Sequence, residues 1–265
     1  MSFIAKSFIF NDVPSENYDL RVFNFERGGL GSSVAGGDIE IISKEMYRRP
    51  IPYFYGVQQK PVLRFPLTFG SYNAMDATTR GLIQQKLFGQ TSYNKLQLVQ
   101  CDMDNVYFNV FLTNPKNAYI GNLNYAFSCE VVCDSPWAWG FEKTYTKSYP
   151  GGGIASDSFT FYNGSANNEY LYPTLEIELN GVGTGVTIIN ETDSNRSFAF
   201  TGLSAYETLT VDNDRKILTS DTGLRRLSGF NLNWFRLLPG YNTISVSGGI
   251  ENIDMSYQFA HRVGG

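Results

Sequence analysis

Strict alternation of apolar and polar residues is the dominant pattern along the chain. From Leu123 to Cys133, an apolar residue or cysteine occupies every second position, and Asn, Ala, Ser and Glu lie between the first of them. Residues 106–111 alternate Val, Phe and Val with Tyr, Asn and Phe, which predicts a strand contacted on both faces. Shorter alternating segments follow at residues 175–179, 198–200, 209–211, 244–246 and 253–259. Short strands bounded by Asn, Asp and Gly predict a sandwich or barrel.

One helix interrupts this pattern between Asn73 and Gly89. Asn73 is expected to cap it, Asp76 lies in its first turn where the helix dipole favours an anion, and Gly89 ends it. The residues that share one face at helical spacing are Met75, Thr79, Leu82, Ile83 and Leu87. The helix is therefore expected to pack against the first sheet and to have no chemical role.

The glycine-rich stretch after Tyr149 suggests a division of the chain. Pro150 is followed by three glycines, which do not suit a central strand and read as a loop or linker. A strand-helix pattern precedes it and an almost purely β pattern follows. We expect two domains that meet between about residues 135 and 155, drawn as 1–140 and 141–265.

An unpatterned aromatic segment stands out near the start. Two strand-like stretches, Ile39–Ile42 and Pro61–Phe65, flank residues 46–56, which have neither helical nor strand period. The aromatic and basic residues of interest there are Tyr47, Arg48, Arg49, Tyr53, Phe54 and Tyr55. One interpretation is a hairpin folded back over its own core. The other is an arm that contacts a neighbouring subunit, because Tyr and Arg supply most anchoring contacts at interfaces.

Composition narrows the class of protein. The 265 residues are 42% hydrophobic, 17% charged and 15% aromatic, with a net charge of −4. This is enough for a packed core, and without a Lys/Arg run a phosphate-tracking surface is not expected. The start of the chain has no signal-peptide pattern and no window has the roughly 18 apolar residues of a membrane helix. A soluble protein, made in a cytoplasm and not inserted in a membrane, is expected.

The three cysteines do not form a disulfide framework. Cys129 and Cys133 lie four residues apart in a strand-like run, which places their Cα atoms about 13 Å apart, beyond disulfide reach. A metal site is the more specific alternative for Cys129 and Cys133, but His261 is the only histidine in the sequence and no second cysteine pair exists. We expect Cys101, Cys129 and Cys133 to be small buried residues and expect no metal.

Candidate catalytic groups are few. His261 is close to the C-terminus, and Glu176 and Glu178 share the polar face of an amphipathic strand. The acidic run from Asp212 to Asp214 resembles a hairpin turn and lacks the later residues of a calcium loop. The glycines of residues 181–185 do not have dinucleotide-binding spacing. We expect no enzyme activity and no cofactor.

The tryptophans are the other candidates for a functional surface. Trp137 and Trp139 lie at the expected domain junction and point the same way if the chain is extended. Packing between domains, a platform that stacks a sugar and a subunit interface are all open for them. Trp234, in the second half, is the third aromatic to test for sugar binding.

Residues 8–16, 127–139 and 235–246 occur in an order that resembles the motifs of the distal tail proteins of long-tailed, non-contractile bacteriophages. Residues 8–16 resemble the first strand and turn of that family. Residues 127–139 are similar to its strand that runs into the domain junction, and residues 235–246 to its Leu-Pro-Gly-x-Asn-x-Ile strand-turn-strand. The resemblance covers nearly the whole chain, although each motif alone is common.

This resemblance implies a mostly β fold and a structural role. Its N-terminal part is expected to be a β-sandwich or split barrel with one helix and a long hairpin arm, and its C-terminal part a galectin-like or jelly-roll sandwich. Family members form a hexameric ring at the distal end of the tail tube, in which the arm clasps the neighbouring copy. The ring connects the tail tube protein to the tail-associated fibre or lysin protein and to receptor-binding proteins, with tape measure protein nearby, and DNA passes through it.

Two other classes of function remain open from the sequence. A carbohydrate-binding, lectin-like adhesion module is the first, because the second half reads as a lectin-like sandwich. A depolymerase or other cell-wall enzyme is the second, because carboxylate pairs are present. The favoured expectation is a virion protein at the tail tip, made in the cytoplasm of the host bacterium.

Overall fold

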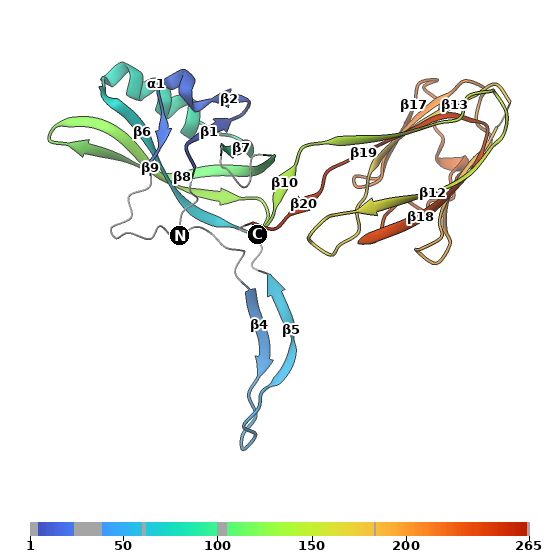
Figure 1. Cartoon of the computed structure of the whole chain (residues 1–265), viewed down its shortest axis with the longest axis horizontal. Helices are drawn as coiled ribbons and strands as arrows, with labels where there is room; N and C mark the ends of the chain where they lie inside the picture. The colour runs from blue at the N-terminus through green and yellow to red at the C-terminus, as the bar shows by residue number, and fades with distance from the viewer. Residues whose placement is uncertain (1–4, 24–38, 60–61, 100–104, 183, 264–265) are drawn as a thin grey trace. The chain divides into compact units, whose positions relative to one another are not determined.

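The computed structural model describes residues 5–23, 39–59, 62–99, 105–182 and 184–263. These residues are mostly antiparallel β-structure, with one α-helix among them, which confirms the expected fold class. They divide into two compact units (Figure 1). The first unit contains the described residues up to Gly140 together with residues 261–263, and the second contains Phe141–Ala260. The end of the chain therefore belongs with the first unit, unlike the expected domain 141–265.

The first unit is built on a curled sheet that runs in the order β2-β1-β7-β8-β9-β6-β3, with β10 paired to β8 and β20 paired to β10. Its strands are β1 (Ser7–Phe10), β2 (Val13–Pro14), β3 (Arg21–Val22), β6 (Arg64–Met75), β7 (Asn94–Val99), β8 (Val106–Ile120), β9 (Leu123–Cys133), β10 (Ala138–Gly140) and β20 (Ala260–His261). The short 3-10 helix η1 (Ser15–Tyr18) follows β2. The amide of Val22 in β3 donates to the Lys6 carbonyl beside β1 at 3.3 Å. The two sides of the sheet thus approach each other as in a split barrel.

Phenylalanine rings fill the interior of the first unit. Phe127 is fully buried, and its ring lies 5.9 Å from that of Phe69 and 6.1 Å from that of Phe88. The helix α1 (Ala77–Phe88) covers this cluster with Ile83 and Leu87, which are 1% and 3% exposed. The helix packs against the first sheet, as the sequence predicted.

The start of the helix differs from the prediction. Asn73 does not cap it, because β6 continues to Met75 and contains Asn73. Asp76 is the N-cap: its backbone is extended, and its Oδ1 accepts a hydrogen bond from the Thr79 amide at 2.7 Å. Leu82, expected on the buried face, is 53% exposed. The buried stripe is therefore narrower than the apolar pattern suggested.

The predicted alternation of residues 123–133 holds in part. From Phe127 to Cys133 every second residue is buried, but Leu123 is exposed and Asn124 is buried. The pairing of β9 shifts register opposite Ala118–Tyr119 on one side and between Gly70 and Met75 on the other. A one-residue shift exchanges the two faces of a strand. In β8, Val106, Tyr107 and Phe108 are all buried, which confirms a strand contacted on both faces there.

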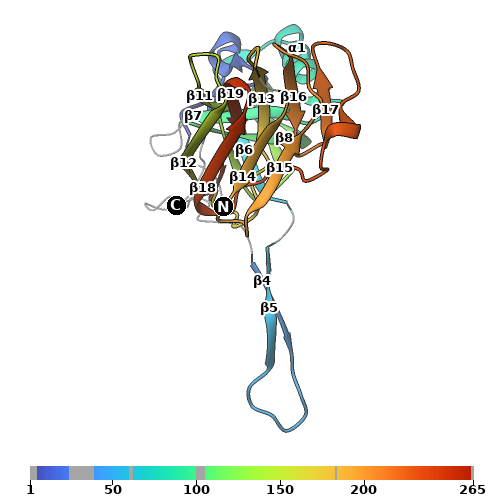
Figure 2. The same ribbon diagram turned by 90° about the vertical axis from the view of Figure 1, so that its right-hand side faces the viewer.

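The second unit consists of two sheets, whose strands Figure 2 shows. The five-stranded sheet has the order β11-β19-β13-β16-β17, formed by β11 (Lys143–Ser148), β19 (Ile250–Tyr257), β13 (Thr174–Leu179), β16 (Thr208–Asp212) and β17 (Ile217–Ser220). The four-stranded sheet has the order β12-β18-β14-β15, formed by β12 (Ala155–Asn163), β18 (Gly240–Gly248), β14 (Val186–Asn190) and β15 (Arg196–Phe200). A short 3-10 helix, η2 (Leu227–Gly229), precedes β18.

Alternating side chains form the core between these two sheets. Leu175, Ile177 and Leu179 are buried, and Glu176 and Glu178 are exposed, as the alternation predicted. The expected hairpin turn lies between β16 and β17. The proline-glycine loop after Tyr149 joins β11 to β12 inside the second unit.

Buried polar side chains fasten the loops of the second unit. Glu207 accepts hydrogen bonds from Arg226 at 2.6 and 2.5 Å, from the Ser220 hydroxyl at 2.6 Å and from the Ser204 amide at 2.7 Å. Its side chain is 0% exposed. Burial by itself raises the pKa of this carboxyl most strongly, but the hydrogen bonds together outweigh burial and lower the pKa below its ordinary value of 4.5. Glu207 is thus an ionised group that holds loops 201–207 and 221–229 together.

Candidate functional site

The hairpin of β4 (Ile39–Lys44) and β5 (Tyr53–Gln59), here called the arm, is the first candidate surface. Within the part of the chain that the structure describes, its strands pair only with each other, in an antiparallel two-stranded sheet (Figure 1). The sequence singled out residues 61–65 as a strand-like stretch beside the aromatic segment; Pro61 lies outside the described residues, and Arg64 and Phe65 begin β6. The partner of β4 is β5, which begins inside the segment that had no strand pattern.

The aromatic side chains of the arm are strongly exposed. Tyr47 is 90% exposed, Phe54 68% and Tyr55 66%. All described side chains from Glu40 to Tyr55 are exposed, so these residues do not form a hairpin folded over its own core. Because successive side chains from Tyr53 to Tyr55 are all exposed, burial imposes no alternation on this part of β5, and the period-two signal is missing from the sequence there.

Two guanidinium groups complete the arm. Arg48 Cζ lies 5.2 Å from the centroid of the Tyr47 ring, and Arg49 Cζ lies 3.7 Å from that of Tyr53. The Arg49 amide donates to the Met46 carbonyl at 3.1 Å, and Arg48 has a positive φ of 67°, so the turn is tight at this point. The arm therefore presents rings and planar cations side by side, the residue types that anchor protein interfaces.

The three tryptophans are all partly buried and belong to different units. Trp137 and Trp139 lie in the first unit, where Trp139 is paired with Tyr107 across β10 and β8. The indole nitrogen of Trp139 is buried and has no hydrogen-bond partner among the described residues. Trp234 lies in the second unit, with its ring 5.0 Å from that of Phe230. Trp234 therefore packs against the core of that unit.

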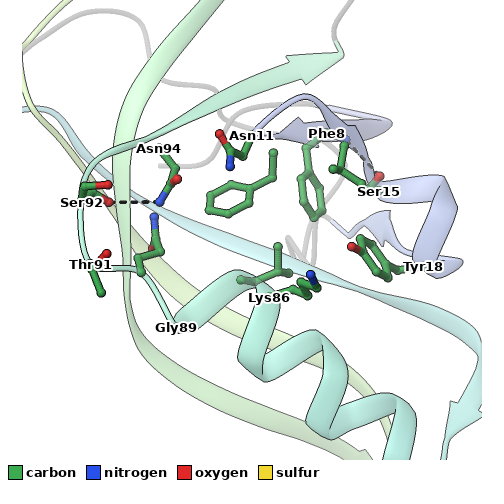
Figure 3. A pocket seen from close by; sticks show the side chains of 13 residues that line it. Phe8, Asn11, Ser15, Tyr18, Lys86, Gly89, Thr91, Ser92 and Asn94 are labelled. Carbon is green, nitrogen blue, oxygen red and sulfur yellow. Dashed lines mark hydrogen bonds between the residues drawn. The ribbon is translucent and has the colours of Figure 1, made fainter.

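A cavity of about 260 Å³ in the first unit was not anticipated from the sequence. Figure 3 shows Phe8, Tyr18 and Lys86 around the same opening, contributed by β1, η1 and the last turn of α1. Asn94 lies on its other side and donates from Nδ2 to the Ser92 carbonyl at 3.0 Å. The walls come from segments far apart in the sequence, so no local pattern could have indicated them.

Exposed tyrosines of the second unit are a further feature that the sequence did not single out. Tyr162 of β12 and Tyr241 of β18 are directly paired, and their rings lie 4.9 Å apart. Tyr170 lies 4.0 Å beneath the guanidinium of Arg236, which also forms an ion pair of 2.7 Å with Asp193. The outward position of Tyr162 in the alternation of β12 is the only local signal.

The chemistry of the described residues is simple. Among them, no group of three or more His, Cys, Asp or Glu residues is arranged to hold a metal ion. Cys129 and Cys133 are buried free thiols, as predicted, and burial raises the pKa of each to about 12. Cys101 lies outside the described residues. The one α-helix of the described chain is too short and too polar to cross a membrane.

Comparisons with known proteins cover nearly the whole chain. A family model described as a phage tail protein N-terminal domain matches residues 3–135, and one described as a phage tail C-terminal domain matches residues 137–257. A search of curated protein sequences found no match.

Solved structures share the fold at low sequence identity. The Dit protein (gp 19.1) of phage SPP1, described as a paradigm of the hub adsorption apparatus in phages that infect Gram-positive bacteria, has a TM-score of 0.70. It is 13% identical, over 97% of this chain and 100% of that one. A chain of the phage p2 baseplate in its activated conformation with Sr has a TM-score of 0.54 at 10% identity, over 96% and 98% of the two chains.

Proposed function

Because the chain belongs to the family of phage tail proteins defined by these N- and C-terminal domains, we propose that it is the structural hub at the distal end of a long, non-contractile tail. Six copies form a ring that joins the tail tube to the tail-tip and receptor-binding apparatus. DNA passes through the ring without specific binding. The family assignment and the fold shared with SPP1 Dit support this role.

The arm is the observation that carries the proposal. A two-stranded hairpin is marginally stable in water by itself, so an arm with rings and apolar side chains exposed on it gains stability when a partner covers it. The first unit of a neighbouring copy is the proposed partner. Such an interface is heterologous, and it closes into a ring when the rotation between copies allows.

The arm is tested by removing its rings while leaving its backbone in place. In the variant Tyr47→Ser/Phe54→Ser/Tyr55→Ser the hairpin pairing is untouched, because none of these side chains packs in either core. Light scattering coupled to size exclusion should give six times the 29.7 kDa chain mass for the parent and the mass of a monomer for the variant. Negative-stain images should show rings only for the parent.

The matched control replaces exposed apolar residues elsewhere. Ile217 and Leu224 are 50% and 55% exposed in the second unit, and Ile217→Ser/Leu224→Ser should assemble like the parent. Rings formed by the arm variant would show that the arm is not the clasp. A parent chain that stays monomeric both alone and with the tail tube protein would contradict the ring itself.

The proposed partners are other tail components. These are the tail tube protein, the tail-associated fibre or lysin protein, the tape measure protein and receptor-binding proteins. The chain is made in the host cytoplasm and incorporated into the virion, and it works without catalysis of its own. Co-purification of the parent with the tail tube protein, and its loss when rings are lost, tests the first of these contacts.

A further inference from the structure

The outer face of the four-stranded sheet of the second unit carries an unusual set of side chains. Directly paired residues of β12 and β18 point to the same side of the sheet. The outward pairs are Ser156 with Ser247, Ser158 with Ser245, Thr160 with Thr243 and Tyr162 with Tyr241. Inward neighbours such as Phe161 and Ile244 are 5% and 1% exposed, which fixes the direction of the alternation. We call this outward surface of β12, β18, β14 and β15 the hydroxyl face.

The hydroxyl face has no charged side chain on any of its four fully described strands. The two charged residues on these strands, Asp157 and Arg196, occupy inward positions of the alternation. Asp157 forms an ion pair of 3.0 Å with Lys147, and Arg196 Nε donates to the Trp234 carbonyl at 3.4 Å. Thr187 and Ile189 of β14 extend the uncharged surface toward β15.

The outer face of the five-stranded sheet is different. Glu176 of β13 lies directly opposite Asp254 of β19, and Glu178 follows two residues after Glu176 on the same side. Like charges in directly opposite positions of a sheet repel each other. The second unit therefore exposes an acidic face on one sheet and an uncharged face on the other. Because hydroxyl groups are exposed on both sheets, the difference between the two faces lies in their charges.

The tyrosine pair stands at one end of the hydroxyl face. Tyr162 is 56% exposed and Tyr241 is 72% exposed, with an angle of 50° between their rings. The turn at Gly164 lies against the edge of the Tyr162 ring, where a Cβ on residue 164 would be 3.2 Å from Tyr162 Cε1. Two large flat apolar surfaces are thus held in place on an otherwise polar sheet.

We propose that the hydroxyl face binds a neutral glycan chain, with sugar rings against Tyr162 and Tyr241 and sugar hydroxyls on the Ser and Thr ladder. A sugar presents C–H groups on its ring faces and hydroxyls around its edge. Aromatic rings suit the former, and Ser and Thr hydroxyls, which both donate and accept, suit the latter. A surface without fixed charges also avoids the cost of burying unpaired ions beneath a neutral ligand.

The same observations disfavour the other kinds of partner. Nucleic acids and anionic wall polymers are held mainly by Lys and Arg, which the hydroxyl face lacks. Protein interfaces are depleted of serine and enriched in arginine at their core, and the hydroxyl face has serines and no arginine, although its tyrosines are of a type that interfaces also use. The proposal does not depend on ring formation, because it concerns the second unit alone.

Affinity gel electrophoresis of the full chain is the test. Gels contain dextran, a β-glucan, a galactomannan or an arabinan as neutral polymers, and polygalacturonate as the anionic one. We expect at least one neutral polymer to retard the parent, and Tyr162→Ala/Tyr241→Ala to weaken that retardation at least ten-fold. Ser158→Asp should weaken it also, since it adds a charge to the face. Light scattering of these variants should give the same mass as the parent, and that result separates this test from the hub proposal.

The matched control lies on the acidic face. Thr144→Asp places a new carboxylate on an exposed strand position of the five-stranded sheet, directly opposite Ser256, and should leave retardation unchanged. Retardation by none of the neutral polymers, or by polygalacturonate only, would overturn the proposal. So would neutral-polymer binding that survives loss of both tyrosines. Binding of another tail protein that is lost in the tyrosine variant, without glycan binding, would assign the face to a protein partner instead.

Discussion

Phenylalanine rings lie at the centre of both the first unit and the second unit. The two units differ in how many asparagines they bury and in how these are hydrogen-bonded. Among the described residues, the first unit buries one asparagine, Asn124, whose Oδ1 has no hydrogen-bond partner. The second unit buries five asparagines. Each of them donates from Nδ2 to a backbone carbonyl and accepts at Oδ1 from a backbone amide. These five are Asn163, Asn180, Asn190, Asn213 and Asn242.

The difference follows from how each unit closes. In the first unit the long strands β8 and β9 pair over much of their length, and α1 covers the ring cluster. In the second unit, long irregular segments such as residues 221–239 pass beside short strands and leave backbone groups that no ladder satisfies. Asparagine side chains supply the missing donors and acceptors. A unit with long loops therefore needs buried amides that a unit with long strands does not.

The largest expected effect comes from the ring cluster of the first unit. Phe127→Ala removes a ring that is 0% exposed and touches Phe69 and Phe88, and should lower the free energy of unfolding of that unit by about 3–5 kcal/mol. Hydrogen exchange measured by mass spectrometry across a urea series reads each unit separately in the full chain. Equal loss of protection in peptides from both units would mean that the two units unfold as one.

A matched pair of asparagine substitutions tests the comparison directly. Asn213 Nδ2 donates to the Pro173 carbonyl at 2.7 Å, and its Oδ1 accepts from the Phe235 amide at 2.8 Å. Asn213→Leu leaves the Pro173 carbonyl and the Phe235 amide without this hydrogen-bond partner. It should lower the free energy of unfolding of the second unit by about 2–4 kcal/mol. The same change at Asn124 loses only contacts of 3.3 and 3.4 Å and should cost the first unit less than about 1 kcal/mol. Equal losses at both positions in the same exchange experiment would remove the contrast.

The smallest effect is a pH dependence confined to the second unit. The hydrogen bonds at Glu207 hold its folded pKa below the ordinary value of 4.5, so its contribution is fully present above that pH. As pH falls below 4.5 and through the folded pKa, the unfolded state binds the proton more readily and the stability is lost. Urea midpoints of the second unit should fall in this range, and Glu207→Gln should flatten the curve there. An unchanged slope in that variant would assign the pH dependence to other carboxylates.

The sequence predicted local structure well where one face of an element is buried. Leu175, Ile177 and Leu179 have such a face, and their alternation was confirmed. Prediction from the sequence was unreliable where the pairing of strands distant in the chain decides the local structure. The start of arm strand β5, from Tyr53 to Tyr55, is exposed on both faces, and Asn124 lies where the register shifts. Asn73 was mistaken for a cap because β6 runs further than its apolar pattern. These features depend on contacts that no single segment contains.

The functional surfaces divide in the same way. The aromatic arm could be picked out because Tyr47 to Tyr55 form one run of sequence. The Tyr162–Tyr241 pair could not, because it exists only through the register of β12 with β18. The cavity beside Phe8 and Lys86 likewise needs β1 and the end of α1 to be brought together.

The path of the chain between the two units has a consequence for how such proteins change over time. The connecting strands are neighbours: β10 pairs with β20, and β11 begins opposite the end of β19, with Lys143 facing Tyr257. A domain whose two ends are adjacent is tolerated as an insertion into another domain. Residues 141–260 thus form an inserted unit whose two ends are adjacent, here called a cassette. Recombination between phage genomes can exchange such a cassette for another with adjacent ends, while the sheet and arm of the first unit stay the same.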